Sequence, residues 1–495
     1  MVRSQGLGQG RKTLALPISF LTNNTSWRIF KQIFLEIIMR QTIENDVWVE
    51  QNFGGTEFGD KRLSKRLLTT AAGITKCPGA SIPQQMGNWN DTKNCYGFLS
   101  NTKVTHKRIQ TPHRERIKKI AAENGKTSLF LQDTSELDYT SLEETDDLGF
   151  IGNHNNKGLM FHSCLAIVPN ASNPEILGLA HQQVWKRKHP SLNKSETRSE
   201  RNKRKRESDV WLTNLKAIGS PPEGCKWVSI GDRANDIYEY LVKSKELGWE
   251  SIVRASQDRL IEVDRKEVLL MPFVRSLHSI GTHNIAMRKK GETKVRNIEV
   301  KVAWKKILLQ PPQRLSGKYE KIPTYVIRCW NEEEGLEWIL YSSIPVNTLE
   351  EAIEKIEWYS NRWIIEEYHK CLKTGCRIES SQLEKSRRLE ALLGVLGIIA
   401  ILMLQLRNIS REDGEKPANE VVDEDTLNII KIRFNLPQEM TVSIFWRSVA
   451  RLGGFIGRRL DGDPGWQTLW KGWLRLLDMI WGLQALRMHM DKKID

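Results

Sequence analysis

The spacing of hydrophobic and polar positions changes twice along the chain. From Trp48 to about Lys107 apolar residues recur at helical spacing, with Asp60 as a plausible N-cap of a helix. Residues 61–66 place four cations within about two helical turns. Such a face is either ordinary solvated surface or a DNA-reading surface. The pattern predicts a small helical region at this end of the chain.

Short apolar runs then replace the helical pattern and predict strands. The region from 255 to about 335 also reads as β-rich, and a long helix is expected to begin near Leu349. Leu392–Leu406 is apolar but too short to span a bilayer comfortably, and arginines flank it, so a buried core helix is expected. The predicted strands cover residues 128–132, 159–168, 175–181, 226–230, 249–254 and 338–342.

A polar, acidic linker follows Asn408, and a final helical region comes after it. There an apolar stripe recurs at helical spacing, which is typical of a packing or dimerisation surface. Its members are Trp466, Trp470, Trp473, Leu477 and Trp481.

These changes of pattern predict four segments. Residues 1–38 form a non-conforming extension, with Met39 a possible true start. Residues 39–107 form a helical domain. Residues 108–410 form a strand-rich domain with an insertion at about 255–335, and 411–495 form a second helical domain.

The charge of the chain points to a polyanionic partner. A net charge of +15 favours nucleic acid over a merely cationic soluble protein. Residues 186–206 are dense in Lys and Arg and are expected to lie where phosphates pass. The seven scattered cysteines include no CxxC pair, so neither a zinc site nor a disulfide framework is predicted. A cytoplasmic, nucleoid-associated location fits best, and residues 11–21 lack the features of a signal peptide.

Two aspartates follow apolar strands: Asp133 after SLFLQ and Asp232 after WVSIG. A single aspartate there often only caps the next helix. Two of them, joined by a later glutamate on a helix, form the set of oxygen ligands that a two-metal phosphoryl-transfer site needs.

The third acid comes from EWYSNRWIIEEYHKCLKTG. On one continuous helix, five polar side chains of this segment would fall within roughly 80° of one face. An acid among phosphate-binding groups suits a metal ligand, whereas a salt-bridged surface helix is the alternative. The five residues are Tyr359, Arg362, Glu366, Lys370 and Lys373.

The spacing Tyr-x2-Arg-x3-Glu-x6-Lys resembles the signature of the IS4-type bacterial insertion-sequence transposases. Further blocks match in the same order from Trp48 to the C-terminal region: QDTSELDY, GDRANDIYEYL, ARLGGF and GWQTLWKGW. The resemblance implies an α/β fold with a ribonuclease-H-like core, a mixed sheet flanked by helices, interrupted by a β-rich insertion. It also implies all-α N-terminal and C-terminal domains for DNA recognition and dimerisation.

The resemblance implies cut-and-paste transposition of DNA. Asp133, Asp232 and Glu366 would hold two Mg²⁺ ions, with Mn²⁺ able to substitute. The enzyme would nick the transposon end, form a hairpin there, reopen it and join the end to target DNA. A homodimer would hold both ends in a synaptic complex.

The resemblance also implies DNA contacts. Trp338 would stack on a flipped base, Arg254 would lie near the DNA end, and terminal phosphates would meet Tyr359, Arg362 and Lys373. His369 and Lys370 belong to the same block, and Arg66 and Lys76 match contacts of the N-terminal domain. Cys77, Gly97 and Ser256 replace a tyrosine, an arginine and a lysine of a relative, which puts the recognised end sequence in doubt.

Two other functions are compatible with these residues. An inactivated DNA-binding protein would usually have lost one of the acids, and all three are present. A ribonuclease-H-type nuclease without joining activity would need neither Trp338 nor the Tyr-Arg-Glu-Lys set. The sequence therefore favours an active transposase.

Overall fold

The computed structural model describes residues 45–125, 127–152, 155–170, 173–188, 206–287, 296–411, 414–458 and 461–491. The predicted extension 1–38, the candidate start Met39 and most of the basic loop 186–206 lie outside the described residues.

The N-terminal region is helical, as the spacing predicts. Asp60 caps α3 by accepting a hydrogen bond of 2.9 Å from the backbone N–H of Arg62. Leu63, Leu67 and Ile74 form the buried face of this helix. The elements are α2 (Asn45–Phe53), α3 (Lys61–Lys76), α4 (Ile82–Met86), α5 (Trp89–Ser100) and α6 (His106–Glu123), of which α6 leads into the sheet.

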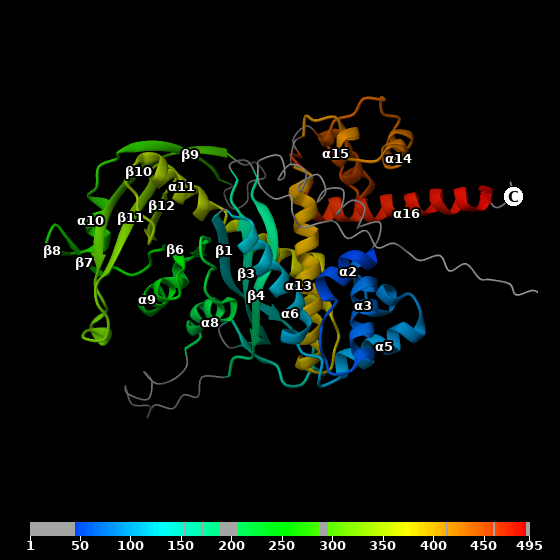
Figure 1. The fold of residues 1–495 in the computed structure, drawn as a ribbon, viewed down its shortest axis with the longest axis horizontal. Coiled ribbons are helices and arrows are strands. Elements are labelled where there is room, and N and C mark those ends of the chain that lie inside the picture. The colour runs from blue at the N-terminus through cyan, green and yellow to red at the C-terminus, as the bar shows by residue number, and fades with distance from the viewer. Residues whose placement is uncertain are drawn as a thin grey trace, which may run out of the picture.

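A mixed sheet forms the centre of the molecule (Figure 1). In its first half the order is β4-β3-β1-β5-β6, with β3 antiparallel to both β4 and β1, and with β1, β5 and β6 parallel. The short β2 also pairs with β3. The strands are β1 (Thr127–Asp138), β2 (Gly149–Ile151), β3 (Asn156–Val168), β4 (Glu175–Trp185), β5 (Lys226–Gly231) and β6 (Glu250–Arg254).

The predicted β-rich segment extends the same sheet. It leaves after β6 and returns through β12 (Leu336–Ser342), which pairs antiparallel with β6. The sheet therefore continues from the core into the insertion, at whose entrance Arg254 and Trp338 lie. The insertion holds β7 (Leu260–Val263), β8 (Lys266–Leu269), α10 (Leu270–Arg275), β9 (Gly281–Met287), β10 (Arg296–Leu309), η2 (Gln313–Leu315) and β11 (Ile322–Asn331).

Helices cover both faces of the sheet. Leu129 and Leu131 of β1 belong to one apolar core, while Phe130 between them belongs to the other. The core that contains Phe130 is covered by α8 (Asp209–Ile218) and α9 (Tyr238–Glu246). The short η1 (Arg233–Asn235) precedes α9. Figure 1 shows α8 and α9 on one side of the sheet and α13 on the other.

The apolar run near residue 400 is a core helix. It forms α13 (Ser386–Ile409), which is longer than the sequence predicts and, among the described residues, is the one helix long and apolar enough to cross a membrane. Its most apolar window is 89% buried inside the fold. Burial within the protein, rather than shortness, is therefore what argues against a membrane span.

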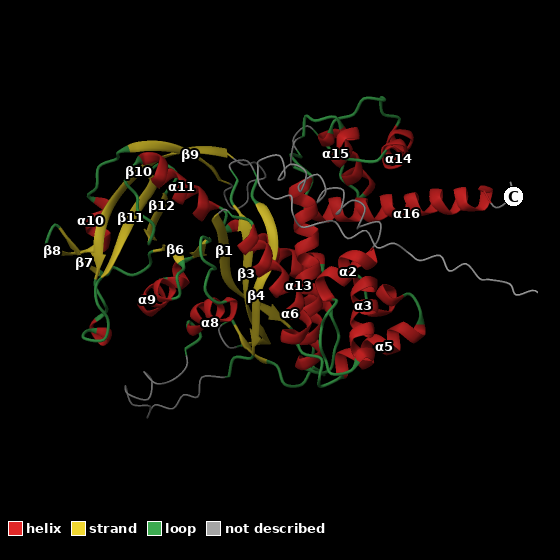
Figure 2. Cartoon of the chain, viewed as in Figure 1, coloured by secondary structure: helices red, strands yellow, loops and turns green. Residues whose placement is uncertain are grey.

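The C-terminal region is helical and contains η5 (Ala418–Glu420), α14 (Glu424–Phe434), α15 (Val442–Leu452) and α16 (Trp466–Asp491) (Figure 2). The tryptophan stripe of α16 is buried by the chain's own packing: Trp466, Trp470 and Trp473 are at most 4% exposed. Trp446 of α15 lies against Trp473, with ring centroids 5.5 Å apart. Packing within one chain therefore explains most of the stripe, and only Trp481 is substantially exposed.

Candidate active site and DNA-binding surface

Asp133 and Asp232 are brought together by strand register. In the parallel pair of β1 and β5, Leu131 lies opposite Ile230. Two residues further along, Asp133 and Asp232 fall at matching positions, about one strand spacing apart and on the same face. The prediction that Asp133 ends its strand is wrong, because β1 continues to Asp138 while paired with β3.

Glu366 reaches this face from a helix. The predicted single long helix is wrong, because the segment divides into α11 (Leu349–Ser360), α12 (Trp363–Lys370) and the π-helical turn η3 (Cys371–Gly375). At the junction, N–H groups bond to carbonyls three residues back, as in Arg362 to Tyr359 and Ile365 to Arg362. The tight junction and the wide turn both change the angle per residue, so the five polar residues do not share one ideal helix face.

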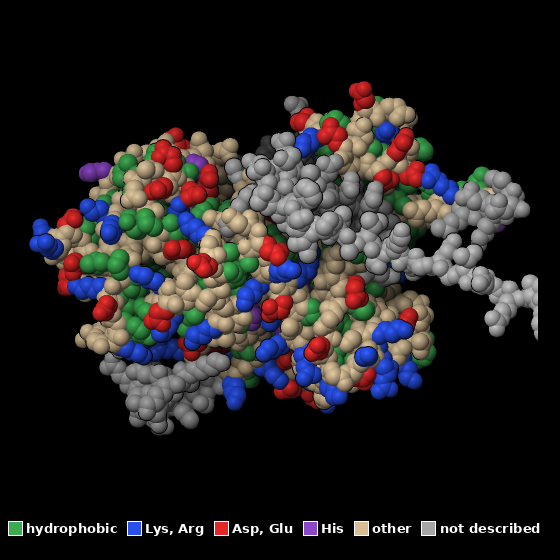
Figure 3. Space-filling model, in the orientation of Figure 1, with side chains coloured by type: hydrophobic (Ala, Val, Ile, Leu, Met, Phe, Trp, Pro, Cys, Tyr) green, Lys and Arg blue, Asp and Glu red, His purple; other side chains and the backbone are tan. Residues whose placement is uncertain are grey.

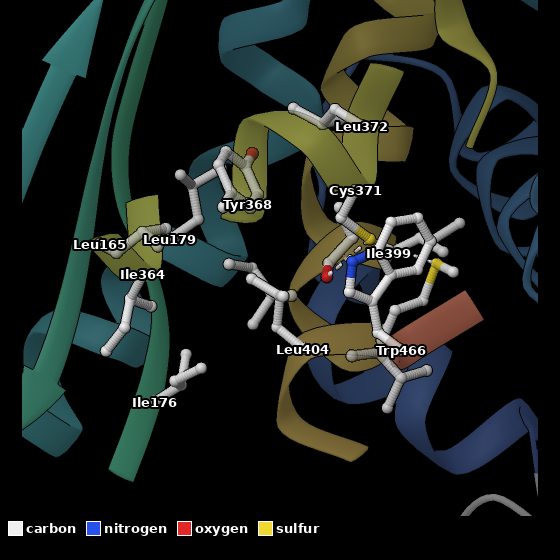
Figure 4. Close-up of a cluster of buried hydrophobic side chains, with 14 of the residues drawn as sticks. Leu165, Ile176, Leu179, Ile364, Tyr368, Cys371, Leu372, Ile399, Leu404 and Trp466 are labelled. Carbon is white, nitrogen blue, oxygen red and sulfur yellow. Dashed lines mark hydrogen bonds between the residues drawn. The ribbon is translucent and has the colours of Figure 1, made fainter. Parts of the chain in front are cut away.

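Apolar packing holds α12 over the strands. Ile364 and Tyr368 lie by Leu165 and Leu179 of the sheet, as Figure 4 shows. The hydroxyl of Tyr368 donates to the carbonyl of Gly397 in α13 and accepts from the amide of Gln182, both at 3.0 Å. These two hydrogen bonds fix the buried face of α12. Glu366, which is partly exposed, lies outside that buried face.

The three acids interact electrostatically. Burial, followed by the charge of Asp232, raises the pKa of Asp133 to about 7; Glu366 adds to the rise, and Arg362 opposes it. The guanidinium of Arg362 lies 2.6 Å from Glu366 and 4.0 Å from Asp133. Within the described parts of the chain, no three acidic, histidine or cysteine side chains stand close enough to hold an ion as placed. Arg362 thus pairs with two of the three carboxylates, those of Glu366 and Asp133.

Trp338, Tyr359 and Arg254 meet beside the acids. The rings of Trp338 and Tyr359 are edge to face, with centroids 5.2 Å apart, and both side chains are buried. Arg254 donates to the carbonyl of Glu337 at 2.9 Å, and burial lowers its pKa. Trp338 and Arg254 line an open pocket of about 350 Å³. This placement leaves room for a planar group next to a cation.

The remaining predicted residues of the block divide into two groups. Lys370 is exposed, and Lys373 is half-buried 3.6 Å from Glu379. His369 instead faces inward: it is 6% exposed, packs against Phe161 and has its pKa lowered to about 3 by burial. The structure does not bring His369 to the surface with the lysines.

The predicted N-terminal contacts lie on the surface. Arg66 and Lys76 of α3 are exposed, as is Cys77 directly after it. Gly97 of α5 is exposed as well, and nothing lies within 4 Å of where its Cβ would stand. Ser256 is exposed, and its backbone N–H donates to Asp236.

Sequence reasoning missed one cationic and one aromatic residue of the pocket. Arg233 directly follows Asp232, and Trp363 directly follows Arg362 with its side chain 56% exposed. The guanidinium of Arg362 lies 5.2 Å from the centre of the Trp363 ring. Each residue directly follows a residue that was predicted for the site. This adjacency in sequence was a signal from which both could have been predicted.

Comparison with known families supplies the decisive observation. Residues 45–104 match the transposase DNA-binding family, and residues 206–403 match the transposase DDE domain family. The chain is a DDE transposase. Its DDE domain makes it an enzyme of DNA phosphoryl transfer, a chemistry that depends on divalent metal. The second match contains Asp232 and Glu366 and begins after Asp133.

One solved structure similar to the transposase is the piggyBac transposase synaptic complex with hairpin DNA. The two are 11% identical, with 86% of this chain and 76% of the other covered, at a TM-score of 0.31. A similarity this weak supports no conclusion about the fold or function of this chain.

Proposed function

We propose that this transposase performs cut-and-paste transposition with Asp133, Asp232 and Glu366 as its catalytic carboxylates. The observation that carries the proposal is their convergence: matching strand positions bring the two aspartates together, and α12 holds Glu366 over the same face. The products would be a nicked end, a hairpin, a reopened end and an end joined to target DNA.

The strand order supports a ribonuclease-H-like core. Three antiparallel strands, β4, β3 and β1, followed by parallel β5 and β6 with helices on both faces, agree with that expectation. The resemblance of the quoted blocks further supports membership of the IS4-type group, near the transposase of transposon Tn-five.

The carboxylates suit Mg²⁺ or Mn²⁺. Three carboxylates offer the hard oxygen donors that these ions prefer, and two ions per site are proposed. The pKa of Asp133 is raised first by burial and then by the charge of Asp232, which is consistent with a carboxylate pair that a bound cation would stabilise. Bound ions would supply activation of the attacking oxygen and charge stabilisation at the leaving oxygen.

Side chains around the carboxylates are proposed to position the DNA end. Tyr359, Arg362, Lys370 and Lys373 are proposed to bind terminal phosphates, where Arg362 would exchange its carboxylate partners for phosphate oxygens. The pocket beside Trp338 and Arg254 would receive a flipped base while the hairpin forms. His369, being buried, would act only by supporting α12.

The proposal extends to the assembly. Two copies would form a homodimer that holds both transposon ends, in a cytoplasmic, nucleoid-associated setting. Among the described residues of α16, the exposed large apolar side chains are Trp481, Leu486 and Met490, and these would be available for contact with a second copy.

The test uses purified protein, Mg²⁺ and a labelled duplex carrying the ends that flank the chain's own gene. We expect nicks, hairpins and joined products on denaturing gels, all of which Glu366→Ala removes. Glu350→Ala is the matched control, because Glu350 is an exposed glutamate in the first turn of the neighbouring α11. End binding without cleavage in Mg²⁺ or Mn²⁺ would favour the inactivated DNA-binding protein, and nicks alone would favour a nuclease.

A further inference from the structure

The outer face of α5 carries two aromatic side chains around a lysine. Trp89, Lys93 and Tyr96 fall within about 60° of one another around the helix. The opposite side, including Cys95 and Phe98, is buried at 1% exposure or less. The helix is therefore fully anchored by its inner face.

Trp89 is the most exposed aromatic of these. It is 80% exposed, and Tyr96 is 37% exposed. A large aromatic ring left in water is stabilised when a partner covers it. A tryptophan that is four-fifths exposed on a well-anchored helix is available to an external partner.

The surroundings of this face fit DNA. The face lies inside residues 45–104, which match the transposase DNA-binding family. Lys and Arg side chains gather over the region where Figure 1 places α3 and α5 (Figure 3). Gly97, beside Tyr96, leaves open space in which a sugar-phosphate backbone can approach closely.

We propose that Trp89, Lys93 and Tyr96 form a DNA-reading face that helps to recognise the transposon end. Trp89 packs its ring on a base or deoxyribose, and Lys93 pairs with an adjacent phosphate. Tyr96 extends the contact along the helix by one turn. The inference rests on the DNA binding of this domain and requires no cleavage.

The experiment measures binding alone, without divalent metal. Fluorescence anisotropy compares a labelled duplex of the natural end with a scrambled duplex of the same length. Trp89→Ala is expected to weaken end binding by about 5- to 150-fold, since stacking of a base on an aromatic ring contributes roughly 1–3 kcal/mol. Trp89→Phe should restore most of the loss. Lys93→Ala should weaken both duplexes and lower the salt slope by about one.

Ile432→Ala is the matched control, because Ile432 is 83% exposed in the C-terminal region. Thermal unfolding of Trp89→Ala should match the parent protein. Unchanged end binding by Trp89→Ala would overturn the proposal, as would a changed oligomeric state without DNA. Loss of cleavage leaves these readouts intact, so a wrong catalytic assignment and a wrong reading face give different results.

Discussion

The two aspartates and the glutamate reach the same face of the sheet by different routes. Asp133 lies within β1, where it pairs with Ser163 of β3, and Asp232 directly follows β5, which pairs with β1. Glu366 is positioned by the side-chain packing of α12, above all Ile365 and Tyr368. A strand ladder sets register in discrete steps, whereas a packed helix can shift by fractions of an ångström.

The difference indicates where the site can adapt. The sheet fixes the two aspartates in place. The helix α12 carries Arg362 at its N-cap and Glu366 in its first turn. Small movement of α12 therefore changes the distance of Arg362 and Glu366 from Asp133 without moving the two aspartates. Changes to the strands and to the helix should have separable effects.

The largest expected effect comes from the strand-borne acids. Asp232→Asn and Asp133→Asn should each reduce nicking at least about a thousandfold, since each removes a charged oxygen donor from the metal-binding set. An asparagine oxygen can still accept from the N–H groups of Ala234 and Thr134, so folding should be preserved. Gel assays of cleavage and end binding are the measurement. Chelation of the wild-type protein should reproduce the loss, and full activity of either variant would remove that residue from the site.

Displacing a strand without removing an acid should have the next largest effect. In Gly231→Ala the new Cβ would stand 2.2–2.8 Å from the buried side chain of Asn235, so the turn after β5 must shift. Asp232 is the next residue, and misplacing a catalytic group by about 1 Å can reduce the rate about a hundredfold. The nicking rate at saturating DNA is the measurement. Gly224→Ala, in an exposed turn before β5, tests whether any strained glycine nearby has the same effect.

The positions of the two aspartates after apolar runs could be predicted from sequence, whereas the geometry of the helical segment that carries Glu366 could not. Asp133 and Asp232 follow apolar runs, and the parallel pairing of those runs brings their ends together. The face containing Glu366 was predicted on an ideal helix, but local hydrogen bonding at Asn361 and the turn after Lys370 depart from 100° per residue. Such departures depend on tertiary packing, which residue spacing does not encode. For the same reason the burial of His369 was not predicted, and the spacing of the α16 tryptophans left packing within the chain and dimerisation open.

Trp338→Ala sharpens the comparison, because this residue lies on β12 while contacting Tyr359 of the helical segment. Hairpin formation should slow by about 5- to 150-fold through loss of base stacking, while the first nick changes much less. Single-turnover gels that resolve nick and hairpin measure both steps. Trp330→Ala is a control, since Trp330 is another buried tryptophan of the same insertion. Equal slowing of both steps would show that Trp338 maintains the structure of the active site and does not stack on a flipped base.

The smallest effect is expected on the helix route, from Tyr368→Phe. The change removes the hydroxyl that bonds to Gly397 and Gln182 in the core, and should lower the free energy of unfolding by roughly 1–2 kcal/mol. The nicking rate should fall by no more than about threefold, or roughly 0.7 kcal/mol, because Ile364 and Ile365 still hold α12. Urea denaturation and the nicking rate are measured together, with Tyr325→Phe as the control, because Tyr325 is a partly exposed tyrosine of the insertion. A large loss of nicking at unchanged stability would mean that one hydroxyl, rather than the packed helix as a whole, sets the position of Glu366.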